Sequence, residues 1–319
     1  MTRVRILNAE PERFSDRARA VLQQLGDLDE QALDRAALLN ALSDYEVLIV
    51  RLGVTVDREL LDAGRRLRAI VTAATGTDHI DVDYANDHGI AVLSLKGEVA
   101  FLRSVTATAE HTWALLLALV RHIPFAFDHV RAGGWDRDLF RGRQLRGLRL
   151  GVVGLGRVGL QVAAYGCAFG MRVAAYDPYL ESWPDGIERV DSLHDLAAAS
   201  DAITLHVPLD PTTQGLVSAA VLAAMTPGAV LVNTSRGAVL DERALLDALH
   251  EGRLAGAALD VAIGERGDLA SSQLLGHART HDTLIVTPHI GGATAETMEA
   301  TELFMAHKLE CFLREGVDS

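Results

Sequence analysis

Cysteine is nearly absent from this chain of 319 residues, with Cys167 and Cys311 as its only two. They lie far apart in the sequence, and their spacing fits neither a disulfide framework nor a metal-binding motif. We therefore expect free, buried thiols in a reducing compartment. We also expect no metal site, because no other cluster of metal-ligand type stands out.

Basic charge is the second shortage. The chain has 30 Lys and Arg residues against 43 Asp and Glu residues, a formal net charge of −13. A face that binds nucleic acid needs a basic surplus, so this composition argues against a nucleic-acid partner. A small anionic ligand stays compatible with it, because a local basic pocket can exist in an acidic protein.

Long hydrophobic runs are missing as well. The longest aliphatic stretch, Trp113–Val120, is far shorter than the roughly 20 residues of a membrane-spanning helix. The first residues predict a strand and lack the apolar core of a signal peptide. We therefore expect a cytoplasmic protein with no membrane partner. Its hydrophobic content of 49% and its length predict two globular domains of ordinary size.

The first hundred residues alternate short apolar runs with segments of helical spacing. This alternation predicts crossover units and a parallel sheet covered on both faces. The expected strands are Val4–Asn8, Glu46–Arg51, Ala69–Ala73 and Ala91–Ser94. The expected helices lie within Ser15–Leu25, Asp57–Ala63 and Val82–His88.

A second alternating series follows one long expected helix, Val99–His122. Six strands with crossover helices are the content of a Rossmann sheet, so the fold class is α/β with two parallel sheets. The strands are Leu150–Val153, Arg172–Tyr176, Ala202–His206, Ala229–Asn233, Gly256–Asp260 and Leu284–Val286. The helices lie near Val158–Phe169, Ser192–Ala199, Ala219–Ala224 and Asp241–His250, with a final one over Thr294–Arg314.

A glycine-rich loop, Gly154 to Gly159, joins the first strand of the second series to its helix. In that context the spacing G-x-G-x-x-G predicts a dinucleotide site rather than a plain turn. Gly154 permits the tight turn, Gly156 lets a pyrophosphate approach the backbone, and Gly159 lets the helix pack on the strand. The helix N-terminus then offers free N–H groups to the phosphates.

Asp177 ends the next strand, eighteen residues beyond Gly159. A carboxylate there accepts hydrogen bonds from the ribose hydroxyls of NAD and repels the 2′-phosphate of NADP. Two alternatives stay open: Asp177 as a simple turn cap before Pro178, and Arg157 in the loop as a partner for NADP.

Arg236, Glu265 and His289 supply the functional groups that reduction of a 2-oxo acid requires. A guanidinium can hold the substrate carboxylate in a two-pronged manner and polarise the keto oxygen. An imidazole can deliver a proton near neutral pH, and a carboxylate beside it keeps the imidazole charged.

The sequence motifs around these residues resemble those of the D-isomer-specific 2-hydroxyacid dehydrogenase family, whose members oxidise lactate, glycerate or 3-phosphoglycerate. They are Asn233–Gly237, Ala258–Val261 and Thr287–Gly292, with 29 residues from Arg to Glu and 24 from Glu to His. The resemblance covers nearly the whole chain. It implies NAD as cofactor, a small 2-hydroxy or 2-oxo acid as substrate, and a homodimer formed through the Rossmann domain.

The resemblance also implies a domain organisation. A substrate-binding domain is expected over residues 1–98 plus 290–319, and an NAD-binding Rossmann domain over residues 99–289, with a cleft between them. A short form without an appended regulatory domain is expected, because the chain ends after the last helix.

Further site residues follow from the resemblance, position by position. The expected cofactor contacts beyond the three glycines and Asp177 are Arg157, Val158, His206, Val207, Pro208, Thr213, Thr234, Asp260 and Gly291. Backbone N–H groups of Thr75 and Gly76 are expected to donate hydrogen bonds to the substrate carboxylate. Lys96 and Arg103 stand where many relatives have no cation, so they either bind a second anionic group of the substrate or are solvated surface cations.

One segment departs from the family. Relatives commonly read Asp-Val-Phe-Glu-x-Glu-Pro where this chain reads Asp-Val-Ala-Ile-Gly-Glu-Arg over residues 260–266. The carboxylate of Glu265 stays in register, and it disfavours formate dehydrogenase, whose histidine partner is typically Gln. A different class also stays open, an NAD(H)-sensing interaction protein of the corepressor type, since fold alone does not fix function.

Overall fold

The computed structural model describes residues 3–267, 269 and 271–315. The chain divides into two compact units, residues 1–104 with 293–319, and residues 105–292. The boundaries expected from the sequence follow residues 98 and 289, whereas the units divide after residues 104 and 292.

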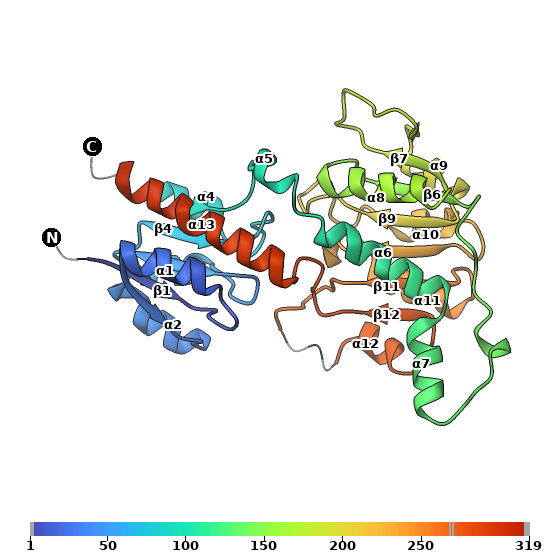
Figure 1. Ribbon diagram of the computed structural model, residues 1–319, viewed down its shortest axis with the longest axis horizontal. Helices are drawn as coiled ribbons and strands as arrows, with labels where there is room; N and C mark the ends of the chain where they lie inside the picture. Colours follow the sequence, from blue (N-terminus) through green and yellow to red (C-terminus); the bar gives the residue numbers. More distant parts are fainter. Residues whose placement is uncertain (1–2, 268, 270, 316–319) are drawn as a thin grey trace. The chain divides into compact units, whose positions relative to one another are not determined.

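A parallel five-stranded sheet forms the centre of the first unit, in the order β2-β1-β3-β4-β5 (Figure 1). This is the flavodoxin-like order of crossover units. Its strands are β1 (Val4–Asn8), β2 (Gly26–Glu30), β3 (Val47–Val50), β4 (Ala69–Thr72) and β5 (Ala91–Leu93). Its helices are α1 (Asp16–Leu25), α2 (Arg35–Ala41), the 3-10 turn η1 (Leu42–Asp44), α3 (Arg58–Ala63), α4 (Val82–Asp87), α5 (Val99–Leu102) and α13 (Ala295–Glu315). Helices α1 and α13 pack side by side, so the last helix joins the first unit.

The edge strand β2 is absent from the sequence prediction because its residues are mostly acidic. It pairs only with β1, and arginines from neighbouring elements neutralise its charges. Arg5 Nη2 donates to Asp29 Oδ2 at 3.0 Å, and Arg19 Nε donates to Glu30 Oε2 at 2.6 Å. An exposed edge tolerates this polarity, whereas the buried strands β3 and β4 are wholly apolar but for Thr72.

The second unit holds a seven-stranded parallel sheet in the order β12-β11-β10-β9-β6-β7-β8. This is the Rossmann order, with a topological switch between β6 and β9. The short edge strand β8 was not predicted from the sequence. The strands are β6 (Arg149–Val153), β7 (Arg172–Tyr176), β8 (Glu188–Arg189), β9 (Ala202–Leu205), β10 (Val230–Asn233), β11 (Gly256–Leu259) and β12 (Leu284–Val286). The predicted α/β class with two parallel sheets is confirmed.

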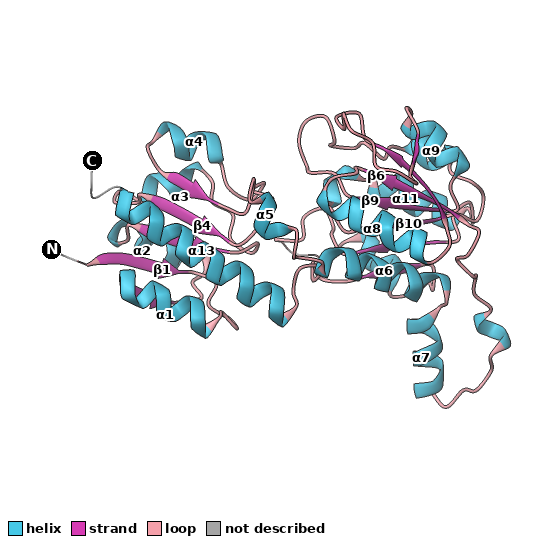
Figure 2. Cartoon of the chain, turned by 45° about the horizontal axis from the view of Figure 1, so that its top comes forward, coloured by secondary structure: helices cyan, strands magenta, loops and turns pink. Residues whose placement is uncertain are grey.

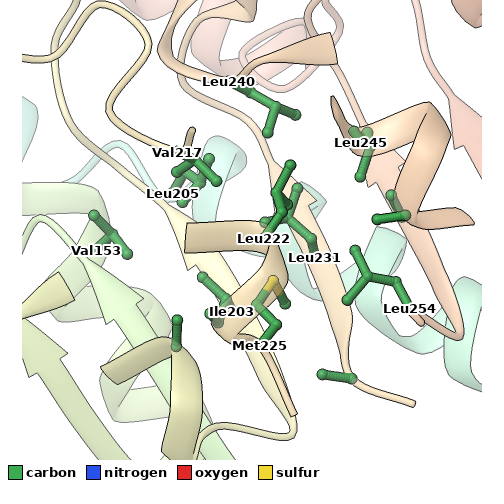
Figure 3. Close-up of a cluster of buried hydrophobic side chains, with 14 of the residues drawn as sticks. Val153, Ile203, Leu205, Val217, Leu222, Met225, Leu231, Leu240, Leu245 and Leu254 are labelled. Carbon is green, nitrogen blue, oxygen red and sulfur yellow. The ribbon is translucent and has the colours of Figure 1, made fainter. Parts of the chain in front are cut away.

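Helices cover both faces of this sheet (Figure 2). One face packs on α6 and α8, and the other on α9, α10, α11 and α12. Their bounds are α6 (Ala107–Val120), α7 (Ile123–Arg131), η2 (Asp138–Phe140), α8 (Arg157–Ala168), α9 (Leu193–Ala199), α10 (Ala219–Ala224), η3 (Gly237–Val239), α11 (Glu242–His250) and α12 (Gln273–Ala278). Figure 3 shows Ile203 and Leu231 of the strands packed against Leu222 of α10 and the neighbouring Met225. This core fixes the strands whose ends carry the site.

The long helix expected over Val99–His122 is wrong, because it is interrupted after Leu102. Helix α5 ends there, and α6 begins only at Ala107. The carbonyl of Val105 accepts hydrogen bonds from Arg157 and Gln161 instead of from a helical amide. The two units divide within this interruption.

The expectation of buried thiols is also wrong. Cys167 and Cys311 are free, but both are exposed. Each lies on the outer face of its helix, since α8 buries Gly166 and Val162 and α13 buries Leu309 and Leu313.

Among the described residues, no single helix has the length and apolar character needed to cross a membrane. Residues 99–120 and 123–131 meet that test only as a pair, and a bend of 61° separates them.

Candidate active site

Arg236, Glu265 and His289 follow three neighbouring strands of the second unit. They lie in the loops after β10, β11 and β12, which are adjacent and parallel in the sheet. Because the carboxyl ends of parallel strands share one edge, the three loops lie together where ligands of such sheets bind.

His289 and Glu265 are in direct contact. His289 Nδ1 lies 2.7 Å from Glu265 Oε1, and each side chain is 21% exposed. Burial opposes ionisation of Glu265, but the hydrogen bond and charge of His289 outweigh it and lower the pKa of this carboxyl. Since Nδ1 faces the carboxylate, Nε2 is the nitrogen left to exchange a proton.

Residues 260–266, whose sequence differs from the one common in the resembled family, form a tight turn that brings Glu265 back toward β11. Gly264 has a φ of 75°, the left-handed region that favours glycine. The amide of Ala262 donates to Glu265 Oε2 at 3.3 Å, and the amide of Ile263 donates to Glu242 Oε1 at 2.6 Å. Burial, with a smaller contribution from the charge of Glu265, raises the pKa of Glu242 against the effect of the Ile263 amide. Glu242 was not predicted, because no local motif links it to this loop.

The turn that carries Arg236 is held by a buried side chain that was also not predicted, Asn233. Its Nδ2 donates to the carbonyl of Arg236 at 2.9 Å, and its Oδ1 accepts from the amide and hydroxyl of Ser235 at 2.9 and 2.7 Å. Gly237 then packs against the next loop: a Cβ there would lie 2.3 Å from the carbonyl carbon of Ala262. The Arg236 loop and the Glu265 loop therefore pack backbone to backbone.

Asp260, at the end of β11, ties the Glu265 loop to the His289 loop. Only 2% of it is exposed, and it accepts from the Thr287 hydroxyl at 2.6 Å, the Ile290 amide at 2.8 Å and the Gly291 amide at 2.7 Å. His111 Nε2 lies 3.1 Å from the same carboxylate. Burial would raise the pKa of Asp260, but these hydrogen bonds together lower it. The expected cofactor contacts of Asp260 and Gly291 stay predictions, and His111, which was not predicted as a site residue, supports the site through its contact with Asp260.

His289 itself has a left-handed backbone, with a φ of 53°. Such a conformation costs a non-glycine residue about 1–3 kcal/mol and persists only where the surroundings hold it. Here its amide donates to the carbonyl of Asp260 at 2.8 Å, while the next two amides donate to the carboxylate of Asp260. These three hydrogen bonds hold the backbone from which the imidazole projects.

The glycine-rich loop has the close contacts and the open space that a dinucleotide needs. Gly154 has a φ of 85°, and a Cβ there would lie 2.7 Å from Val207 and 2.9 Å from the carbonyl oxygen of His206. A Cβ on Gly159 would lie 2.0 Å from the carbonyl oxygen of Gly154, so the helix must pack this closely on the strand. A Cβ on Gly156 would meet nothing within 4 Å, and this residue caps α8 without a side-chain hydrogen bond. Open space beside free helical amides fits a bound pyrophosphate.

Asp177 and Arg157 flank this loop. Asp177 follows β7, is partly exposed, and accepts from the amides of Leu155 at 2.8 Å and Tyr179 at 3.0 Å. Arg157 donates through Nη1 to the carbonyl of Val105 at 2.8 Å, and burial lowers its pKa. This bond occupies one of the five N–H donors of the guanidinium, so a cofactor contact of Arg157 stays a prediction. The adjacent Val158 packs against the core of α6 and α8.

The remaining expected cofactor residues follow β9 and β10. Burial lowers the pKa of His206 to about 3, so its imidazole is neutral, and its Nε2 has no hydrogen-bond partner within the described residues. Thr213 closes the same loop by donating to the carbonyl of Pro208 at 2.6 Å. The hydroxyl of Thr234 lies 2.8 Å from that of Thr112 in α6. Direct contacts of these residues with a cofactor stay predictions.

The expected substrate-binding residues lie in the first unit: Thr75 and Gly76 in the loop after β4, Lys96 in the loop after β5, and Arg103 at the end of α5. Thr75 is exposed and Gly76 partly so. The amide of Leu95 donates to the carbonyl of Ala74 at 3.0 Å, which joins the loop that carries Thr75 to the loop that carries Lys96.

Lys96 and Arg103 are both exposed, and neither forms an ion pair with any residue that the structure describes. Lys308 of α13, which was not predicted, donates to the carbonyl of Ser94 at 2.9 Å and pairs with Glu98. Lys308 is therefore neutralised by Glu98, whereas Lys96 and Arg103 are exposed.

Comparison with known proteins supplies independent findings. Residues 113–291 match the family model described as the NAD-binding domain of D-isomer-specific 2-hydroxyacid dehydrogenases. The chain is 38% identical over 317 residues to D-3-phosphoglycerate dehydrogenase of Methanocaldococcus jannaschii, covering 98% of this chain and 58% of that protein. It is 34% identical over 284 residues to hydroxypyruvate reductase of Thermotoga maritima, covering 89% of this chain and 90% of that protein.

Solved structures agree with the fold. The D-lactate dehydrogenase of Aquifex aeolicus, solved in complex with NAD and lactic acid, superimposes with a TM-score of 0.86 at 30% identity, covering 98% of this chain and 96% of that one. The chain spans about half the length of the curated phosphoglycerate dehydrogenases that it matches, between 49% and 58%.

Proposed function

The chain belongs to the D-isomer-specific 2-hydroxyacid dehydrogenase family and contains its NAD-binding domain, and from this premise we propose that it interconverts a small D-2-hydroxy acid and the corresponding 2-oxo acid. The observation that supports this most directly is the 2.7 Å contact between His289 and Glu265 at the strand ends that also carry Arg236. An imidazole, a carboxylate and a guanidinium in adjoining loops are the groups that the reaction needs.

Each of the three side chains has a role that follows from its chemistry. Arg236 holds the substrate carboxylate and polarises the keto oxygen. His289 donates a proton through Nε2 to that oxygen during reduction and removes it during oxidation. Glu265 stabilises the imidazolium form of His289. When bound, NAD(H) supplies or accepts the hydride at the substrate C2.

The cofactor is held by the residues around the glycine-rich loop. The amides at the start of α8 bind the pyrophosphate beside Gly156, and Asp177 binds the adenosine ribose. His206, Val207, Pro208 and Thr213 line the adenine end, and Thr234, Asp260 and Gly291 support the nicotinamide end.

The substrate is proposed to be a 2-oxo acid with a second anionic group. Thr75 and Gly76 bind its carboxylate through their amides, and Lys96 or Arg103 binds the distal anion. Support comes from the exposure of both cations without an ion pair among the described residues, and from the relatives named D-3-phosphoglycerate dehydrogenase and hydroxypyruvate reductase. One charge-assisted contact is worth about 1.5–3 kcal/mol, so a dianionic substrate should gain about ten- to a hundredfold in kcat/KM.

A substrate screen that follows NADH absorbance tests this function. Glyoxylate, pyruvate, hydroxypyruvate and 3-phosphohydroxypyruvate are compared with the parent, His289→Ala, Lys96→Ala and Arg103→Ala. We expect turnover that falls by about a hundredfold or more in His289→Ala, and a preference for the phosphorylated acid that falls in the Lys96 or Arg103 variant. NADH binding without turnover of any 2-oxo acid would instead support an NAD(H)-sensing protein. Equal behaviour of both cation variants and the parent would remove the second-anion site but leave the dehydrogenase function.

A further inference from the structure

Three histidines form a cluster in the second unit that the proposed reaction does not use. His250 ends α11, His277 lies in α12, and His281 follows α12. One ring nitrogen from each lies within 4.8 Å of the others. His277 is buried, while His250 and His281 are exposed, so the cluster opens to solvent through two of its rings.

The cluster lies away from the active-site loops. Helix α11 ends at His250 just before β11 begins, and Thr283 immediately precedes β12. The cluster is therefore near the amino ends of these strands, whereas Glu265 and His289 follow their carboxyl ends. Figure 1 shows α12 beside β12, with α11 in the same unit.

The ring of His277, the buried histidine of the cluster, is oriented as the ring of a metal ligand is. His277 Nε2 lies 3.0 Å from the hydroxyl of Thr283, which fixes the ring orientation as outer partners do in metal sites. Its other nitrogen, Nδ1, lies 3.3 Å from His250 Nε2. That separation is long for a hydrogen bond, for which about 2.7–3.2 Å is usual. Two nitrogens bound to one tetrahedral zinc at about 2.0–2.1 Å lie about 3.3–3.4 Å apart.

The third histidine completes the donor set. His277 and His281 have the spacing His-x-x-x-His, and their rings stack with centroids 4.1 Å apart. His281 Nδ1 is 2.8 Å from the hydroxyl of Thr280, which leaves Nε2 for a ligand bond. Because His281 is exposed, rotation of its side chain closes the remaining distance without moving the core. Asp247 lines the same surface pocket.

We propose that His250, His277 and His281 bind one divalent transition-metal ion of the zinc class. Three neutral imidazoles are a donor set that suits zinc, copper or nickel rather than magnesium or calcium, which prefer oxygen ligands. The ion links the end of α11, helix α12 and the segment before β12. Its role is structural, since it stabilises the path into the strand that leads to His289.

Zinc binding by the full-length, untagged chain tests the site. The protein is stripped with a chelator, equilibrated with zinc chloride, desalted and assayed for metal content, and the affinity is measured by titration calorimetry. We expect one tightly bound zinc per chain. Loss of an outer partner typically weakens metal binding by about 10–100-fold, so His250→Ala and His281→Ala, which remove direct ligands, should weaken it at least that much.

Two variants serve as matched controls. His194→Ala removes an exposed histidine elsewhere in the same unit, and His289→Ala removes the active-site imidazole; both should retain the zinc. Zinc should also raise the thermal midpoint of the parent and of both controls, but not that of the two cluster variants. The proposal is overturned if the parent binds no stoichiometric zinc, or if His250→Ala and His281→Ala bind it as the parent does.

Discussion

In the proposed reaction, His289 donates a proton to the substrate only while its imidazole is protonated, and a carboxylate at 2.7 Å, that of Glu265, favours the protonated form. The pKa of Glu265 is itself lowered, chiefly through its bond to His289 acting against burial. The carboxylate is therefore ionised at neutral pH, and its stabilising effect is lost only when acid protonates it.

Glu265→Gln should move the alkaline limb of the pH profile for 2-oxo acid reduction to lower pH. The amide carries no charge, so the imidazolium loses its proton more readily as pH rises. The measurement is kcat/KM for reduction across the alkaline range, with Glu251→Gln at an exposed position of the same unit as control. An alkaline limb that stays in place would show that Glu265 does not tune His289.

Under the proposed cofactor site, Asp177 is expected to select NADH over NADPH by at least about tenfold, because a carboxylate at that position hydrogen-bonds a ribose diol and repels a 2′-phosphate. It also accepts from the Leu155 amide at 2.8 Å, so removing the side chain alters the glycine-rich loop as well. Asp177→Asn keeps an acceptor for that amide and removes the charge. It should narrow the NADH-to-NADPH ratio in kcat/KM, whereas Asp177→Ala should also weaken NADH binding. Equal efficiency of the parent with both cofactors would contradict the assignment.

At the scale of elements, the side-chain carboxylate of Asp260, just after β11, adds to the backbone hydrogen bonds that hold the loop after β12. Three donors and His111 surround Asp260. Asp260→Asn would set an amide N–H₂ group against at least one of these donors. An unsatisfied buried donor costs about 1–3 kcal/mol. We expect a lower thermal midpoint without cofactor, faster hydrogen exchange at Ile290 and Gly291, and a lower kcat.

Asp282→Asn, at an exposed position before β12, is the control for that experiment. If Asp260 contacted only the cofactor, Asp260→Asn would weaken NADH binding and leave the thermal midpoint of the free protein unchanged.

The elements that could be predicted from the sequence are those whose cause is local. Buried parallel strands such as β3 and β10 are apolar runs, and Gly154 and Gly159 mark the turn into α8. The break between α5 and α6 instead contains Val105, whose carbonyl accepts from Arg157, 52 residues away. Strand β2 depends on arginines of other elements. These partners lie 11, 24 and 52 residues apart in the sequence, and no local pattern of hydrophobicity identifies them as partners.

The residues of the candidate site likewise fall into those that a local motif identifies and those that only distant contacts bring to the site. Arg236, Glu265 and His289 lie in recognisable sequence motifs, so they could be predicted as site residues from the sequence alone. His111 could not, because its contact with Asp260 spans 149 residues of sequence. Glu242 reaches Ile263 across 21 residues, and the His250 cluster joins two helices. These contacts arise only once the sheet has brought its loops together.

At the scale of the whole molecule, one apolar segment of the second unit has no cover within the described residues. Ile123, Phe127 and Val130 of α7 are 53%, 61% and 49% exposed, and Trp135 is 91% exposed. Their spacing places the three α7 residues on one helical face. Figures 1 and 2 show α7 extending away from the sheet of its unit. Such a patch marks an interaction surface, and we propose a second copy of the chain as its partner.

In a two-fold dimer each copy offers the same patch to the other, so one substitution alters the interface twice. Phe127→Glu places a charge in the apolar face of α7 and should shift the protein from dimer to monomer in sedimentation velocity at micromolar concentration. Tyr179→Glu changes an aromatic residue that is 76% exposed elsewhere in the same unit, and this control should remain dimeric. A monomeric parent, or a dimer that survives Phe127→Glu and also Trp135→Glu, would show that α7 and the segment after it do not form the interface.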